Sequence, residues 1–155
     1  MSAVIVSLRI EAPPQAVFDA FTKDIALWWR PNPLFQLTPR GDGDLRFELG
    51  EGGRLLTTLA NGNKAFEIGR ITLWAPPGAL AFTWRQATFA SNQQTLVEVR
   101  FEAIGAGTRV SVTHRGWDEI PQDHVARHGF PLTVFQQRQG EQWRAALSAL
   151  AARVR

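Results

Sequence analysis

The sequence has 155 residues, a length that one hydrophobic core serves, so we expect a single domain over residues 1–155. There is no cysteine, which excludes disulfides, thiolate nucleophiles and sulfur-ligated metals and favours a cytoplasmic location. The net charge is only +3, and arginines are interspersed with acidic residues, so we expect no nucleic-acid partner. No run approaches the roughly eighteen apolar residues of a membrane span, so we expect no membrane partner.

The N-terminal segment predicts a strand followed by helical turns. Val4, Val6, Leu8 and Ile10 alternate with more polar residues, which is the period of a strand with one buried face. The following "APPQAVFDAFTKDIALWW" spaces its apolar residues by three and four, as a helix does. We expect one helix, or two short ones broken near Lys23 and Asp24 and ended by the prolines that follow.

From Leu45 to Trp117 the sequence predicts antiparallel strands joined by short turns. "GEGG" separates two such strands and is interpreted as a hairpin turn, not a nucleotide loop. In the last hairpin, a turn at 104–107 places Glu102 opposite Arg109 and Val97 opposite His114. His114 is then the polar group on an otherwise apolar face.

The C-terminal part is predicted to be helical, with a short segment around "PQDHVARHGF" and a long helix from about Leu132 to Val154. His124 and His128 stand four apart, a spacing that could seat a zinc ion on one helical face. The metalloprotease pattern needs a glutamate where Val125 stands, so we interpret both as surface or capping histidines and predict no metal site.

Several segments, in this order, resemble the START-like (SRPBCC) superfamily, and within it the bacterial relatives of the C-terminal domain of the heat-shock-protein-90 ATPase activator. These segments are "APPQAVFDAFT", "DIALWW", "GEGGRL", "EIGRITLWAPPGALAFTW", "VEVRFEAIGAGTRVSVTHRGW" and "GEQWRAALSAL". The resemblance implies an α+β helix-grip fold. In it, a curved antiparallel sheet of about six to seven strands wraps a long C-terminal helix, with two short helices after the first strand. Such folds often enclose an apolar cavity between sheet and helix.

Aromatic residues supply the candidates for lining this cavity, because ten Phe and six Trp exceed what packing a domain of this length requires. Plain core packing remains the alternative for most of them. In the helical frame, Trp28 continues the buried stripe, whereas Trp29 turns about 100° away. Trp29 is therefore the better candidate for the rim or lid of a cavity, with packing under the following loop as the alternative. The candidate residues are Trp29, Phe35, Phe47, Trp74, Phe82, Trp84, His114, Trp117, Phe130 and Phe135.

Three functional hypotheses follow. The first is a small-molecule binding protein that holds an apolar, lipid-like, aromatic or polyketide-like ligand without any cofactor. The second is a cyclase- or hydrolase-type enzyme in which His114 works beside a polar group such as Arg70 or Thr72. No catalytic residue is assigned, because we find no nucleophile motif and no inward carboxylate pair. The third is a chaperone-associated interaction domain using the basic C-terminal helix; the chain would act as a monomer or homodimer.

Overall fold

A computed structural model of the protein describes residues 3–29, 44–58 and 65–154. Its core element is a seven-stranded sheet in the order β1-β7-β6-β5-β4-β3-β2, in which every neighbouring pair is antiparallel. The strands are β1 (Ala3–Ile10), β2 (Leu45–Phe47), β3 (Arg54–Thr58), β4 (Ala65–Ala75), β5 (Ala79–Trp84), β6 (Thr95–Ile104) and β7 (Gly107–Arg115). "GEGG" joins β2 to β3, so its prediction as a hairpin turn is confirmed.

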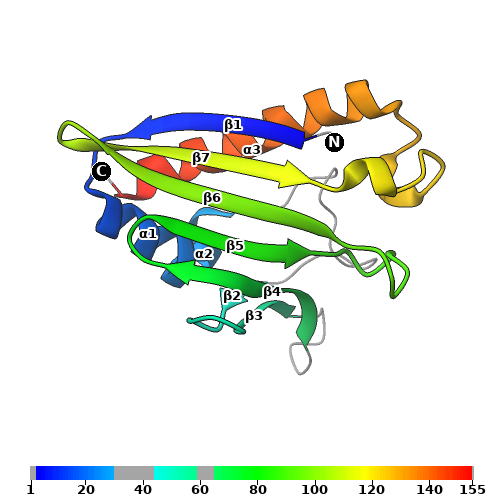
Figure 1. The fold of residues 1–155 in the computed structure, drawn as a ribbon, viewed down its shortest axis with the longest axis horizontal. Helices are drawn as coiled ribbons and strands as arrows, with labels where there is room; N and C mark the ends of the chain where they lie inside the picture. The colour runs from blue at the N-terminus through cyan, green and yellow to red at the C-terminus, as the bar shows by residue number, and fades with distance from the viewer. Residues whose placement is uncertain (1–2, 30–43, 59–64, 155) are drawn as a thin grey trace.

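One face of the sheet is covered by helices. The long helix α3 (Leu132–Val154) runs along β1 and β7, while α1 (Pro14–Lys23) and α2 (Ile25–Trp28) lie near the end where the β6–β7 hairpin turns (Figure 1). The expected helix-grip fold of class α+β is therefore confirmed, including the two short helices after the first strand. Within the described residues, none of the helices combines the length and apolar character needed to cross a bilayer.

The break between the two short helices falls where the sequence predicted it. Pro14 occupies the first turn of α1, where a missing N–H costs nothing. Asp24 leaves the helical conformation at φ −107° and ψ 21°, and α2 begins at the next residue. The break turns Trp28 back onto α1, and its indole N–H donates to the carbonyl of Ala20 over 2.9 Å.

The β6–β7 hairpin fixes the position of His114. Glu102 pairs with Arg109, and Val97 pairs with His114, which is the predicted register. Side chains alternate along β7, so Val110, Val112 and His114 face α3 while the intervening residues face outward. The strand pleat that buries Val110 and Val112 therefore also places the His114 imidazole in the interior.

The segment between β7 and α3 differs from the helical prediction. It contains two short 3-10 turns, η2 (Trp117–Glu119) and η3 (Val125–Arg127). His128 has a left-handed backbone at φ 53°, so His124 and His128 do not share the face of an α-helix. His124 instead caps η3, because its Nδ1 accepts from the Ala126 N–H over 3.0 Å.

Candidate functional site

A group of aromatic rings surrounds His114 between the sheet and α3. We call it the Trp–His cluster, and its members are Trp29, Trp84, His114, Trp117 and Trp143. The ring centroid of His114 lies 5.8, 5.6 and 6.0 Å from those of Trp84, Trp117 and Trp143 respectively. His114 is fully buried, and the three indoles around it are 1% exposed. The cluster is therefore closed to solvent.

Both nitrogens of His114 have polar neighbours. Nε2 lies 2.7 Å from the Thr95 hydroxyl and 3.2 Å from the indole nitrogen of Trp117. Nδ1 lies 3.1 Å from the indole nitrogen of Trp143 and 3.4 Å from the amide nitrogen of Gln139. Four side chains from β6, η2 and α3 thus converge on one imidazole.

Burial determines the charge of this imidazole. Desolvation lowers the pKa of His114 from 6.5 to about 3, because the charged form loses its hydration on burial. His114 is therefore neutral at physiological pH. Its conjugate acid is too strong for efficient proton abstraction near pH 7, so the site favours hydrogen bonding over general-base catalysis.

A buried arginine holds the segment between β7 and α3 against one side of the Trp–His cluster. Arg127 donates to the carbonyl of Ile120 over 2.8 Å and to that of Phe130 over 2.7 Å. Its guanidinium carbon also lies 5.4 Å from the ring centre of Phe135, which in turn packs 4.7 Å from Trp117. This arginine connects two points of an irregular segment and holds it against the rings.

The other aromatic candidates are distributed over the rest of the domain. Phe47 and Phe82 are buried 5.2 Å apart in a separate group near α1, and half-buried Trp74 packs 5.0 Å from Phe18. Phe130 is half-buried beside the arginine wall. Phe35 lies outside the described residues.

The structure places Trp29 deeper than the helical frame indicated and removes Arg70 and Thr72 from the surroundings of His114. Trp29 is only 9% exposed and lies 5.7 Å from Trp84 and 5.6 Å from Trp143. It leaves the helical conformation at φ −69° and ψ 126°, and its ring lies 6.0 Å from that of Trp28. Arg70 and Thr72 are exposed on the opposite face of the sheet, and Arg70 pairs with Glu67, so neither stands beside His114.

Sequence reasoning missed three members of the site. Trp143 was not among the candidate residues, although its N–H reaches His114. Gln139 was not singled out, yet it stands four residues from both Phe135 and Trp143 and is fully buried. A polar residue inside an apolar helical stripe is a recognisable signal. Thr95 shares the face of Val97 and could have been found from the strand period.

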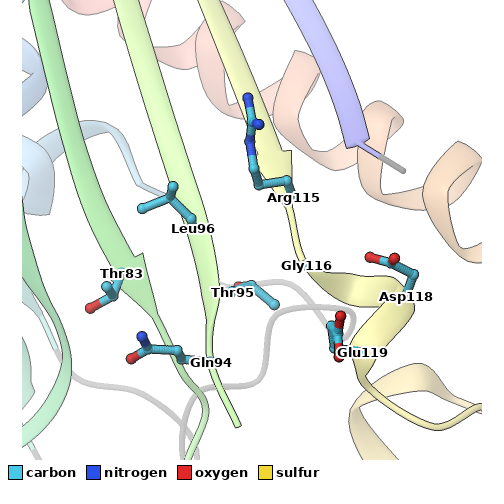
Figure 2. Close-up of a pocket in the computed structure, with 8 residues that line it drawn as sticks. All are labelled: Thr83, Gln94, Thr95, Leu96, Arg115, Gly116, Asp118 and Glu119. Carbon is cyan, nitrogen blue, oxygen red and sulfur yellow. The ribbon is translucent and has the colours of Figure 1, made fainter. Parts of the chain in front are cut away.

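A surface pocket lies on the other face of the sheet. Its volume is about 360 Å³, and Figure 2 shows Thr83, Leu96 and Arg115 on the strands that form it, with α3 behind them. Asp118 and Glu119 border the same pocket. The strand side chains Thr83, Leu96 and Arg115 lie on the face of the sheet away from α3, so this pocket is not the predicted cavity between sheet and helix. Thr95 also lines the pocket, and its hydroxyl contacts His114.

The seven-stranded sheet packs against α3 around the Trp–His cluster, so the chain has the α+β helix-grip fold. The family described as Activator of Hsp90 ATPase homolog 1-like protein matches residues 11–155. The chain therefore belongs to this family. None of the curated protein sequences matches it.

Solved structures share the fold at low sequence identity. A Bacillus halodurans protein superposes with a TM-score of 0.70 at 18% identity, over 100% of this chain and 98% of that one. The Aha1 dimer from Colwellia psychrerythraea gives a TM-score of 0.68 at 17% identity, covering 99% and 96%. The anthrahydroquino-gamma-pyrone synthase Txn09 is 27% identical, with a TM-score of 0.57 and coverage of 98% and 96%.

Proposed function

We propose that the protein binds an aromatic, largely apolar small molecule between the inner face of the sheet and α3, at the Trp–His cluster. The observation that carries this proposal is that indoles from three separate elements enclose one buried imidazole. Trp84 comes from β5, Trp117 from η2 and Trp143 from α3. Flat, rigid indoles provide large surfaces for stacking against a planar ligand.

The polarity of the cluster supports recognition over simple packing. A core built only for stability avoids buried imidazole and amide groups, because each must be desolvated. Here His114 and Gln139 are both fully buried. The Gln139 carbonyl oxygen has no hydrogen-bond partner among the described residues. A few polar atoms within an apolar lining are typical of small-molecule sites, where they orient the ligand.

A ligand can reach the closed Trp–His cluster only if the segments that cover the cluster move apart. Two walls lie outside the strands and α-helices: the β5–β6 connection, from which Phe89 packs 5.6 Å from Trp117, and the segment fastened by Arg127. Irregular segments of this kind open at lower free energy than the centre of a sheet. A ligand would enter by displacing these rings while the sheet and α3 remain in place.

The comparison with the synthase supports the aromatic class of ligand. By its name, Txn09 makes an anthrahydroquino-gamma-pyrone, which is a fused aromatic compound. The two chains are 27% identical over nearly their full lengths. The proposal for this chain is binding; its neutral, weakly basic histidine does not by itself supply a reaction.

The test is a titration of the purified protein with planar aromatic probes, fluorene and 9-fluorenone, followed by tryptophan fluorescence and thermal unfolding. We expect saturable quenching together with a higher Tm. A probe at about a hundred times its Kd stabilises the fold by about 2.7 kcal/mol. Indole signals of Trp84, Trp117 and Trp143 in two-dimensional NMR spectra should shift. Unchanged spectra and Tm with both probes would remove the proposal.

The family match favours a second candidate, an Hsp90-associated role. An Hsp90 activator from Plasmodium falciparum also shares the fold, with a TM-score of 0.58 at 20% identity over 91% and 88% of the chains. The test is the ATPase rate of the cognate Hsp90 with and without this protein. An unchanged rate, with no co-elution of the two proteins, would remove this candidate. The same chromatography distinguishes monomer from homodimer.

A further inference from the structure

Two irregular segments meet over the Trp–His cluster, and we call them together the cover. The first is the β5–β6 connection, residues 85–94, and the second is the β7–α3 segment, residues 116–131. Phe89 on the first packs 5.6 Å from Trp117 on the second, with the two rings at 88° to each other. Both residues are buried, at 4% and 1% exposure. The two segments therefore close the cover by direct contact.

Each segment of the cover is held in its own shape by an arginine. In the β5–β6 connection, Arg85 donates to the carbonyl of Phe89 over 3.1 Å. In the β7–α3 segment, Arg127 donates to the carbonyls of Ile120 and Phe130 over 2.8 and 2.7 Å. These internal bonds favour movement of each segment as a unit. Opening the cover then means separating one segment from the other.

His124 lies at the contact between the two segments. Its Nε2 lies 3.0 Å from the carbonyl oxygen of Thr88, and its ring packs edge-on at 5.5 Å from Phe89. Nδ1 accepts the Ala126 N–H over 3.0 Å, so the ring proton is on Nε2 and is donated to Thr88. Turning the ring over would place carbon atoms opposite both partners, so the two bonds also fix its orientation. One imidazole thus caps η3 and joins it to the β5–β6 connection.

The bond from His124 to Thr88 lies where it breaks at low cost. His124 is half-buried and Thr88 is exposed, so water replaces the bond when the segments separate. The bond from Arg127 to Ile120, by contrast, is buried, and breaking it would leave both groups without a partner. The contact at His124 therefore opens before the β7–α3 segment loses its own shape.

From this geometry, and resting on the proposed function, we infer that His124 is a latch that controls how fast a ligand enters and leaves the Trp–His cluster. Its contacts are Thr88, Phe89 and Ala126, which belong to the cover and not to the cluster. The bond to Thr88 is present whenever the cover is closed, with or without a ligand. Its loss destabilises both closed states equally, so entry and exit accelerate by the same factor and the affinity stays constant.

The test compares two substitutions that have in common the loss of the bond to Thr88. His124→Asn keeps a side-chain oxygen for the Ala126 N–H, because asparagine is a favoured N-cap residue, but its amide is too short to reach Thr88. His124→Phe keeps a ring against Phe89 and has no nitrogen. Stopped-flow tryptophan fluorescence with 9-fluorenone measures the rates. Both association and dissociation should be about three- to tenfold faster in each variant, with Kd within about twofold, as loss of one ordinary hydrogen bond predicts.

His128→Asn is the matched control. His128 lies in the same segment and is exposed, and its ring is 6.4 Å from Phe130, which is not part of the latch. Its left-handed backbone at φ 53° is one that asparagine tolerates. Both rates should equal those of the wild type. Wild-type rates in both His124 variants, or a change in only one of the two rates, would overturn the inference.

Hydrogen exchange tests the latch without a ligand. The indole N–H of Trp117 is buried, so it exchanges when the cover opens, and it should exchange faster in both His124 variants. The Trp28 indole, bonded to Ala20 in α1, is the internal reference and should keep its wild-type rate, because general destabilisation would accelerate both. Unchanged Trp117 exchange would overturn the inference. Accelerated exchange in a protein that binds neither probe would overturn the proposed function and leave His124 as the latch of the cover.

Discussion

The core between the sheet and the helices contains different aromatic residues at its two ends. At the end near α1, phenylalanine rings pack against one another; this Phe cluster consists of Phe18, Phe21, Phe47, Phe82 and Phe101. At the opposite end of β7, where it leads into η2, tryptophans surround a histidine. Phenylalanine offers only carbon surface, whereas tryptophan adds a polar N–H. Under the proposed function, the Phe cluster stabilises the fold and the Trp–His cluster recognises the ligand.

The adjacent tryptophans Trp28 and Trp29 mark the boundary between the two regions. Trp28 packs 5.0 Å from Phe21, and Trp29 packs against Trp84 and Trp143. The two rings touch at 6.0 Å, so the clusters form one continuous core. Neighbouring positions in the sequence therefore serve different ends of the molecule.

The largest effect is expected in the Phe cluster. Phe21→Ala should lower the free energy of unfolding by about 3–5 kcal/mol, because a fully buried ring leaves a cavity among four other rings. Chemical denaturation measures this loss. The fraction that remains folded should bind 9-fluorenone with unchanged affinity. A weaker affinity in the folded protein would show that the two regions are not separate.

The next effect is acid sensitivity of the Trp–His cluster. The unfolded chain protonates His114 below about pH 6.5, whereas the folded protein keeps it neutral down to about pH 3. The unfolded state then binds the extra proton, so stability falls as the pH drops through this window, and above it His114 contributes no pH dependence. At about 1.4 kcal/mol per pH unit, the loss at pH 4.5 is about 3 kcal/mol.

Denaturation curves between pH 7 and 4 measure this loss, and His114→Gln is the matched control. Its unfolding free energy should fall less steeply over the same range, because glutamine does not titrate. Among the described residues, five side chains whose contacts with His114 are established do not titrate in this range either: Thr95, Trp84, Trp117, Gln139 and Trp143. Identical slopes for both proteins, or a wild-type imidazole that NMR finds protonated at pH 5, would contradict the prediction.

The smallest effect is expected on the outer face. Arg115 pairs with Glu98 over 2.6 Å, but both side chains are about 40% exposed. Exposed pairs contribute about 0–1 kcal/mol, so Arg115→Gln should change stability by no more than that. Binding of 9-fluorenone should be unchanged, because Arg115 lies on the outer face of the sheet, whereas the proposed ligand binds on the inner face. A large loss of affinity would indicate that the ligand binds on the outer face of the sheet.

The sequence predicted the architecture well because periodicity and turns specify it locally. The hairpin register, the break at Asp24 and the span of α3 all follow from residue spacing, and all are found in the structure. The inward position of His114 follows from the same strand period.

The partners of His114 were harder to predict because they come from distant positions. Trp143 lies 29 residues after His114, and its N–H reaches the ring only when α3 docks on the sheet. The depth of Trp29 likewise depends on its own extended backbone at the end of α2, which a continued helical frame does not predict. The 3-10 turns around His124 were missed because a short apolar pattern does not distinguish one turn from a helix.

The Arg127 wall suggests where this domain could be modified with little risk. One guanidinium holds the carbonyls of Ile120 and Phe130, and the exposed Gln122 amide donates to the Gly129 carbonyl over 3.0 Å, so Arg127 and Gln122 together hold the intervening segment. Asp123 and Val125 are exposed along the same segment. A library randomised at these two positions could vary the outer surface of the segment while its two anchors, the sheet and α3 stay fixed. The segment is thus a natural starting point for engineering ligand entry.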